Sequence, residues 1–449
     1  MHTLPKRELT KHPLWMVLGT LYASTWLLLG MAPTGDPSDA EVPLRLIYTT
    51  DTLGQIDTCG CSGGQHGGLS RRATLVRRLS EGSAEMIVLD GGQVTDSPQQ
   101  AAYFAEAYDL MGYDLVLIDG TEPTDLEEAL RGRDVPTLAR PNSRASDPLP
   151  SHVMELKDGL RVIVLVAPAE TAELGVLVER VEAACVGLER ERTLVLLATR
   201  LDPKANAQLA ELLGDSVDLV LGASSPSRSR DYRDAIPPGK AVLAISRGKA
   251  LTVVDIHIDE DGGQPRIEAR FEPVAPSIVP DAWVAGVVER YYDEAAPRSR
   301  PSGVGDAETI DYVMRGWADA VTCGECHPAE LESWRETQHA HAIPTLARVN
   351  RLVDECLACH SEQYRRTDAF DPDLMVPGDG VTCATCHGDG LVHSMTSRTE
   401  YIQRDPGEAL CVSCHNEERQ PSGFEYEESW AKIAHGNGVY EATAEEGGE

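Results

Sequence analysis

Four copies of the pentapeptide Cys-x-x-Cys-His constrain this chain more than any other feature of its sequence. They begin at Cys323, Cys356, Cys383 and Cys411 of a chain of 449 residues. This pentapeptide is the attachment pattern of c-type haem. The two thiols add across the vinyl groups of the porphyrin, and the histidine that follows becomes the proximal ligand of the iron. The sequence therefore predicts four covalently bound haem c groups.

A zinc ribbon or a disulfide framework would also use Cys-x-x-Cys pairs, but neither gives a reason for a histidine after every pair. Four repeats also exclude a chance occurrence of the pattern. The predicted attachment thiols are Cys323, Cys326, Cys356, Cys359, Cys383, Cys386, Cys411 and Cys414. The predicted proximal ligands are His327, His360, His387 and His415.

The distal ligands are less sharply marked in the sequence. Residues 304–449 hold four further histidines, which equals the number of irons: His339, His341, His393 and His435. Three methionines of this segment compete with them as ligands: Met314, Met375 and Met395. We expect mostly bis-histidine, low-spin irons. A shortage of distal ligands would instead leave a five-coordinate iron that can bind a small molecule.

The N-terminus has the pattern of an export signal. Lys6, Arg7 and Lys11 precede an apolar stretch from Leu14 to Ala32. This arrangement predicts either a cleaved signal peptide or an uncleaved membrane anchor within residues 1–32. Both alternatives send the rest of the chain out of the cytoplasm, so we expect a periplasmic or otherwise exported protein, with membrane attachment only in the second case.

Short runs of Val, Ile and Leu alternate with amphipathic stretches between residues 44 and 275, which predicts a layered α/β domain. The predicted strands are 44–50, 86–89, 115–118, 162–166, 194–198 and 219–222, with two later strands at 240–246 and 251–258 in a more antiparallel arrangement. The predicted helices are 69–79, 99–111, 171–184 and 206–213. A helix and a linker follow in residues 276–303, and a small, mostly helical and loop-rich tetrahaem domain occupies residues 304–449, with short helices at 329–338, 346–355 and 426–433.

The first domain resembles the calcineurin-like metallophosphoesterases, in particular their 5′-nucleotidase and thiosulfohydrolase branch. The resemblance rests on Tyr48-Thr-Thr-Asp51-Thr-Leu53-Gly54, on Gly67-Gly-Leu-Ser-Arg-Arg72-Ala and on Leu89-Asp-Gly-Gly-Gln93. It implies a dinuclear metal site at the strand ends, where paired metals activate water. Most of the ligands that the family uses are replaced, however. The substituted positions are Leu53, Gln93, Gly120, Thr121, Ala198 and Ser224. We therefore expect a scaffold without phosphoesterase activity.

Three cysteines lie outside the haem motifs. Cys59 and Cys61 belong to a glycine-rich loop after the first predicted strand, and Cys185 lies in a predicted helix. An odd number of remaining thiols leaves at least one outside any internal disulfide. Exposed loop thiols are seldom inert, so Cys59 and Cys61 are candidates for a redox or metal-binding role. Cys185 fits a small core residue.

The second domain resembles the tetrahaem cytochrome family of ammonia-oxidising electron transfer. The resemblance rests on Ala320-Val-Thr-Cys323 with its pentapeptide, on His339-Ala-His341, on Val381-Thr-Cys383 with its pentapeptide, and on Trp430-Ala-Lys-Ile-Ala-His435. It implies haems close enough together for rapid electron hopping. Because the family couples such haems to other redox proteins, it also implies an electron donor and an electron acceptor as partners.

The net charge of the chain limits which classes of partner it can bind. The chain has 40 basic and 72 acidic residues, a net charge of −32, which argues against nucleic acid and favours redox partners with a basic docking face. Two classes of function remain. The first is an exported electron carrier whose α/β domain docks or binds a partner. The second is a multihaem oxidoreductase that acts on a small nitrogen or sulfur compound at a five-coordinate haem.

Overall fold

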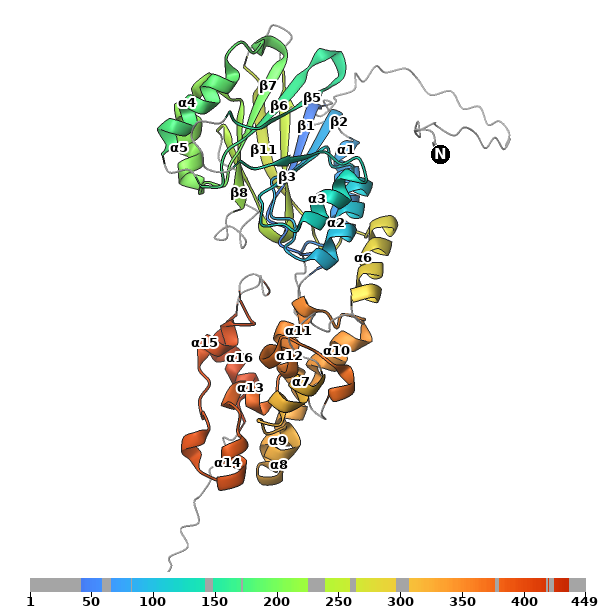
Figure 1. Ribbon diagram of the computed structural model, residues 1–449, viewed down its shortest axis with the longest axis vertical. Coiled ribbons are helices and arrows are strands. Elements are labelled where there is room, and N and C mark those ends of the chain that lie inside the picture. Colours follow the sequence, from blue (N-terminus) through green and yellow to red (C-terminus); the bar gives the residue numbers. More distant parts are fainter. Residues whose placement is uncertain are drawn as a thin grey trace, which may run out of the picture. The chain divides into compact units, whose positions relative to one another are not determined.

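The structure is a computed structural model, shown in Figure 1. It describes residues 42–58, 66–81, 83–141, 148–170, 173–224, 239–258, 264–295, 307–375, 379–416, 419 and 424–435. The predicted signal or anchor, the two loop cysteines Cys59 and Cys61, and the linker at 297–305 lie outside these residues. Residues 41–449 form one compact unit, so the domain boundaries given above remain predictions.

The first part of the chain, the α/β region, alternates strands and helices as far as residue 295. Its strands are β1 Val42–Thr49, β2 Ser83–Asp90, β3 Leu115–Ile118, β4 Thr137–Ala139, β5 Ser151–Glu155, β6 Arg161–Val166, β7 Thr193–Ala198, β8 Leu219–Ser224, β9 Ala241–Ala244, β10 Ala250–His257 and β11 Arg266–Pro273. Its helices are α1 Leu69–Ser80, α2 Pro98–Met111, α3 Thr124–Arg131, α4 Leu174–Cys185, α5 Pro203–Leu213 and α6 Ala282–Ala295.

These strands form two sheets. Among the described residues, one sheet has the strand order β11-β10-β1-β2-β3-β4 and the other has the order β5-β6-β7-β8-β9. Strands β1 to β4 run parallel to one another, as do β6 to β9. Since parallel strands carry crossover helices, both sheets need helical cover on their outer faces. The carboxyl ends of the parallel strands thereby become the edge at which loops gather.

Alternate residues of β1 explain how the layers are held together. Leu44, Leu46 and Tyr48 belong to a core cluster that also contains residues of β6, β7 and β8, so they face the second sheet. Ile47, one position out of step, belongs to a different cluster with residues of α1, α2 and α6. A strand that is buried on both faces in this way must be almost continuously apolar. The α/β region is therefore a sandwich of two sheets between two layers of helices.

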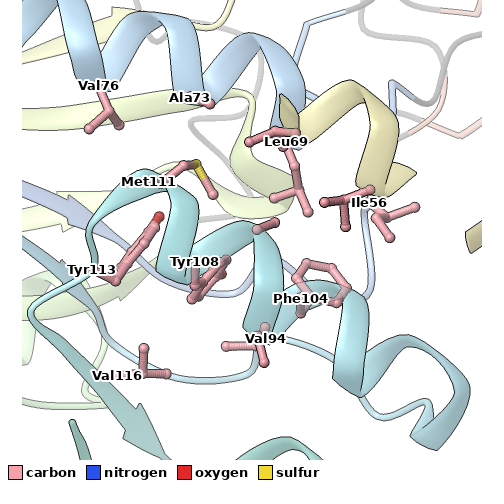
Figure 2. Packing of buried hydrophobic residues seen from close by; sticks show 14 of the residues in the cluster. Ile56, Leu69, Ala73, Val76, Val94, Phe104, Tyr108, Met111, Tyr113 and Val116 are labelled. Atoms are coloured by element: carbon pink, nitrogen blue, oxygen red, sulfur yellow. The ribbon is translucent and has the colours of Figure 1, made fainter. Parts of the chain in front are cut away.

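The helical layer on the first sheet is packed mainly by aromatic and aliphatic side chains of α1 and α2. Figure 2 shows Leu69, Ala73 and Val76 of α1 above Phe104 and Tyr108 of α2. The outer face of the second sheet is covered in the same way by α4 and α5, which lie together in Figure 1. These two layers fix the strand ends and thus position the loops that follow β1, β3, β4 and β7.

The second part of the chain, the haem-motif region, is built from short helices. They are α7 Ala307–Met314, α8 Ala320–Cys326, α9 Pro328–Arg335, α10 Ala342–Arg348, α11 Asp354–His360, α12 Glu362–Thr367, α13 Cys383–His387, α14 Leu391–Thr396, α15 Glu408–Val412 and α16 Tyr426–Ile433. Its apolar cluster of buried residues is small: Ile343, Leu346, Leu357 and Phe370. So small a core is in keeping with a fold in which haem supplies much of the apolar contact area.

The structure confirms the α/β class of the first part and the helical class of the second, but two details of the prediction are wrong. A helix over 346–355 is not formed, because α10 ends at Arg348 and Asn350 takes a left-handed φ of 54° before α11 begins at Asp354. Only one of the two late strands has the predicted antiparallel arrangement. Strand β9 extends the second sheet in parallel with β8, whereas β10 pairs antiparallel with β1.

Within the described part of the chain, every helix is too short or too polar to cross a lipid bilayer. Residues 1–32, with the predicted signal or anchor, do not belong to that part.

Candidate functional site

Each haem motif lies on a short helix or at its end. Cys323 and Cys326 are in α8, Cys356 and Cys359 in α11, Cys383 and Cys386 in α13, and Cys411 in α15. Residues three apart on a helix lie on the same face, so the pairs in α8, α11 and α13 each present both sulfurs in one direction, whereas Cys414 follows the end of α15. The structure thus gives the motifs the local geometry that attachment to one porphyrin edge requires.

Three motif histidines lie opposite a histidine from another part of the chain. The ring centres of His327 and His393 are 6.2 Å apart, with their planes inclined by 23°. His339 and His415 are 6.1 Å apart, inclined by 54°. His387 and His435 are 5.8 Å apart, inclined by 58°. Each pair joins one motif histidine to one of the four predicted distal candidates.

These separations fit a metal ion between the two rings. An imidazole nitrogen binds a metal at about 2 Å, so two axial imidazoles on one ion place their ring centres about 6 Å apart. Direct packing of two rings does not require that spacing in three separate places. The residues present therefore fit haem iron held by two imidazoles, and the fit appears at three of the four motifs.

Backbone carbonyls orient several of these rings. The Nδ1 atom of His387 is 2.7 Å from the carbonyl oxygen of Gln403, that of His393 is 3.1 Å from Arg398 O, and that of His360 is 3.1 Å from Ala342 O. A hydrogen bond at Nδ1 fixes the tautomer and leaves Nε2 for a metal. Burial also lowers the pKa of His339 and of His435, which keeps both imidazoles in the neutral, metal-binding form.

The remaining candidate, His341, differs from these. Its side chain is exposed, whereas its near neighbour in sequence, His339, contributes to a pair. A distal candidate therefore does not necessarily pair with the motif that is nearest to it in the sequence. His339 follows the first motif along the chain but lies opposite the histidine of the fourth.

The four motifs are also close to one another. The thiols of Cys323 and Cys383 are within hydrogen-bonding distance, and so are those of Cys359 and Cys414. In the haem-loaded protein these sulfurs would be thioethers. Cys386 and Cys411 are close enough to interact electrostatically. Hydrogen bonds between thiols thus join the first motif to the third and the fourth to the second, whereas the third and fourth motifs interact only electrostatically.

The second motif is next to the α/β region. Val353, directly before α11, is 2% exposed and belongs to the same core cluster as α1, α2 and α6. Arg351 forms ion pairs of 3.1 Å with Asp57 and with Glu289, and its guanidinium lies over the ring of Tyr292. Asp57 lies just before the loop that carries Cys59 and Cys61. The structure thus anchors the start of that loop beside the second motif, although the two cysteines themselves are outside the described residues.

The strand ends of the α/β region hold a network of buried ions where the resemblance places a dinuclear metal site. Arg140 Nε is 2.5 Å from Asp119 Oδ1, and these side chains are 1% and 3% exposed. Arg200 Nη1 is 2.6 Å from Asp51 Oδ1, and Arg200 Nε is 3.4 Å from Asp119 Oδ2. Burial lowers the pKa of Arg200, but the carboxylates of Asp51 and Asp119 outweigh it and raise that pKa above its usual value.

Sequence reasoning missed both arginines. Each comes one or two residues after a strand, Arg140 after β4 and Arg200 after β7, and a charged residue in that position was the available signal. Their guanidinium groups lie between carboxylates that could otherwise have served as metal ligands. Among the described residues, no group of three or more His, Cys, Asp or Glu side chains could hold a metal ion.

The substituted ligand positions have taken other roles. Leu53 is 41% exposed, and the backbone amide of Gln93 donates to the carboxylate of Glu122 at 2.5 Å. Asp51, Leu53 and Gln93 all adopt left-handed φ values between 51° and 55°. Such conformations are strained for residues other than glycine and cluster at functional sites. The loops that follow β1 and β2 therefore carry strained backbone at three positions.

Comparison with known proteins identifies the haem-motif region. A family model of cytochrome c554 and c-prime matches residues 322–388. The C-terminal region is cytochrome c554-like. Cytochrome c-554 of Nitrosomonas europaea is 28% identical to this chain over 85 residues, which is 15% of this chain and 36% of the relative. This chain thus spans little more than a third of that curated relative. The match supports covalently bound haem c in this segment.

Solved structures similar to this chain are nucleotidases and a related hydrolase. Sulfate thiohydrolase SoxB of Thermus thermophilus has a TM-score of 0.44 at 18% identity, covering 59% of this chain and 62% of its own. The 5′-nucleotidase precursor of Thermus thermophilus has a TM-score of 0.44 at 19% identity, covering 56% and 58%. NAD nucleotidase of Haemophilus influenzae has a TM-score of 0.40 at 12% identity, covering 56% and 60%. The α/β class itself follows from the two sheets described above.

Proposed function

We propose that this protein is an exported tetrahaem c-type cytochrome that passes electrons between redox partners. The observation that carries the proposal is the set of three imidazole pairs, each with the spacing of two axial ligands on one iron. An iron with both axial positions filled by protein ligands exchanges electrons without binding substrate. The proposed axial ligands are His327 with His393, His415 with His339, and His387 with His435, and His360 is the proposed proximal ligand at the second motif.

The contacts between motifs support a path for electrons. When bound, the haems supply the redox-active iron, and this chain's residues decide the spacing. Hydrogen bonds between attachment thiols join the first and third motifs and the fourth and second motifs, and thiols of the third and fourth motifs interact electrostatically. The segment 304–449 has 10 basic and 28 acidic residues, a net charge of −18, which favours donors and acceptors with a basic docking face. Electrostatic steering of this kind weakens as salt is added.

Counting haems and spin states tests this proposal. We expect mass spectrometry of the purified mature protein to show four covalent haems, all within residues 304–449, and low-temperature electron paramagnetic resonance to show mainly low-spin iron. Fewer than four haems would contradict the proposed cofactor content. A high-spin iron that binds nitric oxide or hydroxylamine would instead favour the alternative, an oxidoreductase acting at a five-coordinate haem.

We propose further that the α/β region is a docking or binding module rather than a phosphoesterase. Hydrolysis of this kind needs two metal ions held by several carboxylate and imidazole ligands. At the strand ends, Asp51 and Asp119 are already neutralised by Arg200 and Arg140. A cation arriving there would have to displace a buried guanidinium from each carboxylate. The contacts of Arg351 and Val353 with this region support a role close to the second haem motif.

Metal analysis tests the second proposal. After subtraction of haem iron, we expect the full chain to hold less than one equivalent of zinc or manganese, and to show no hydrolysis of nucleotides or phosphodiesters above the buffer rate. Incubation with added manganese should change neither result, because the two arginines occupy the carboxylates. Two equivalents of metal together with nucleotide turnover would show that the region is an enzyme.

The proposed location is the periplasm or another exported compartment. Attachment of haem to Cys-x-x-Cys-His, and the charged and apolar pattern of residues 1–32, both support export. N-terminal sequencing of the purified protein would separate a cleaved signal from a retained anchor. Cys59 and Cys61 keep the redox or metal-binding role proposed for them from the sequence.

A further inference from the structure

Arg366 is a buried cation in the interior of the haem-motif region. It lies in α12, between the second and third motifs, and its side chain is 6% exposed. Its guanidinium lies over the ring of Trp317, which precedes the first motif. Only 10 basic residues occur in residues 304–449, so the burial of one of them is notable in a region where cations are scarce.

Some N–H donors of the Arg366 guanidinium have no hydrogen-bond acceptor in the described part of the protein. It forms an ion pair with the carboxylate of Glu362, one turn earlier on the same helix. An arginine has five N–H donors. Nη2 faces that carboxylate, whereas in the described part of the chain Nε and Nη1 of Arg366 are shielded from solvent and have no hydrogen-bond acceptor. A buried donor without an acceptor is destabilising, and more so when it is charged.

Glu362 is also shared among several groups. The hydroxyl of Thr385 donates a hydrogen bond to it, and Arg365 Nη1 is 4.0 Å from Glu362 Oε2. Burial lowers the pKa of Arg366 to about 10, although Glu362 acts in the opposite direction. One shared carboxylate therefore does not compensate the desolvation of this cation. A second anion next to Arg366 would compensate its buried charge.

Haem brings such an anion to this place. Trp317 and Ala318 lie before the first motif, and the backbone amide of Ala318 donates to the carbonyl oxygen of Asp389, just after the third motif, at 2.8 Å. Arg366 is therefore near the two motifs whose attachment sulfurs, Cys323 and Cys383, are in contact. Each attached haem carries two propionate carboxylates. The planar fork of arginine matches a carboxylate with two parallel hydrogen bonds.

We propose that Arg366 binds a propionate carboxylate of a haem attached to the first or third motif, and that its positive charge stabilises the reduced form of that haem. The proposal rests on the proposed function, because it needs haems at these two motifs. It makes Arg366 a positioning and potential-setting residue, since it acts on the iron through the propionate. A positive charge held in a region of low dielectric constant favours the added electron.

The test compares three variants of the full chain by spectroelectrochemical titration. Arg366→Gln removes the charge and the fork, Arg366→Lys keeps the charge but removes the fork, and Arg365→Gln removes an equal charge from the neighbouring, less buried position. We expect Arg366→Gln to lower the reduction equilibrium constant of one haem about tenfold, which is about 59 mV for one electron. Arg366→Lys should lower the reduction potential of that haem by less than half of the shift seen in Arg366→Gln. Arg365→Gln should also shift it by less than half of that amount.

Unchanged potentials in Arg366→Gln, or equal shifts in Arg365→Gln and Arg366→Gln, would overturn the proposal. If Arg366→Gln does not accumulate, the proposal is tested by comparing the resonance Raman spectra of Arg366→Lys and the wild type. A changed propionate bending band supports the proposal, and an unchanged band contradicts it. The covalent haem count of the wild type is measured in the same preparations. Fewer than four haems there would refute the proposed function, which distinguishes that failure from failure of the role of Arg366.

Discussion

Replacing His393 by alanine is expected to convert one low-spin haem iron to high spin while leaving four covalent haems in place. The ring of His393 is 6.2 Å from that of His327, the proximal histidine of the first motif. Removal of one axial imidazole leaves that iron five-coordinate, whereas attachment depends on Cys323 and Cys326 and is unaffected. Electron paramagnetic resonance should show one new high-spin centre, and mass spectrometry should show an unchanged haem mass.

His341 offers a matched control. It lies two residues from His339, but its side chain is exposed, while His339 is paired with His415. We expect His339→Ala to produce one high-spin iron, as His393→Ala does, and His341→Ala to leave the spectrum of the wild type. High-spin iron in His341→Ala, or none in either His339→Ala or His393→Ala, would show that the three pairs are not axial ligands.

The haem motifs could be identified from sequence because their chemistry is local. Attachment needs two thiols and a histidine within five residues, and one helical turn is enough to place them. The pairing of distal histidines is different, since it depends on how distant segments meet. His393 follows the third motif but lies opposite the first, and His435 follows the fourth but lies opposite the third. The spacing of histidines along the chain therefore does not predict which of them pair.

The strands of the α/β region could be predicted for a similar reason. Burial on both faces forces continuous apolar runs, and those at 115–118 and 162–166 correspond to β3 and β6 almost residue for residue. The helix predicted over 346–355 failed because the apolar residues Leu346, Leu352 and Val353 do not share one helix. Leu346 faces the small core of the haem-motif region, whereas Val353 packs on the α/β region. Because these apolar residues pack against two different parts of the protein, their spacing in the sequence resembles that of one apolar helix face although they belong to separate segments.

The strand-end arginines show another limit of sequence reasoning. Leu53 and Gln93 stand where the resemblance places metal ligands and so predict a region without bound metal, but they do not say what compensates the carboxylates that remain. Asp51 and Asp119 are 6% and 3% exposed, so they need cations if no metal is present. Only the three-dimensional arrangement shows that Arg140, from the end of β4, and Arg200, from the end of β7, supply them.

Replacing Arg140 by methionine is therefore expected to destabilise the α/β region by about 3–5 kcal/mol. Besides its ion pair with Asp119, Arg140 donates hydrogen bonds to the carbonyl oxygens of Gly91, Ala167 and Ala198 at 2.9 to 3.3 Å, and so ties together strand ends of both sheets. The substitution leaves a buried carboxylate with only the longer contact to Arg200. Urea unfolding of the full chain, followed by far-ultraviolet circular dichroism, measures the loss.

Two comparisons separate this effect from a general loss of packing. Arg131→Ala breaks an exposed ion pair with Glu127 in α3 and should cost no more than about 0.5 kcal/mol. Adding Asp119→Asn to Arg140→Met removes the uncompensated charge, so the double variant should be more stable than Arg140→Met alone by more than about 1 kcal/mol. Equal stabilities of the single and double variants would mean that the buried charge is not what Arg140 compensates. In that case the hydrogen bonds to the carbonyl oxygens of Gly91, Ala167 and Ala198 would account for its effect.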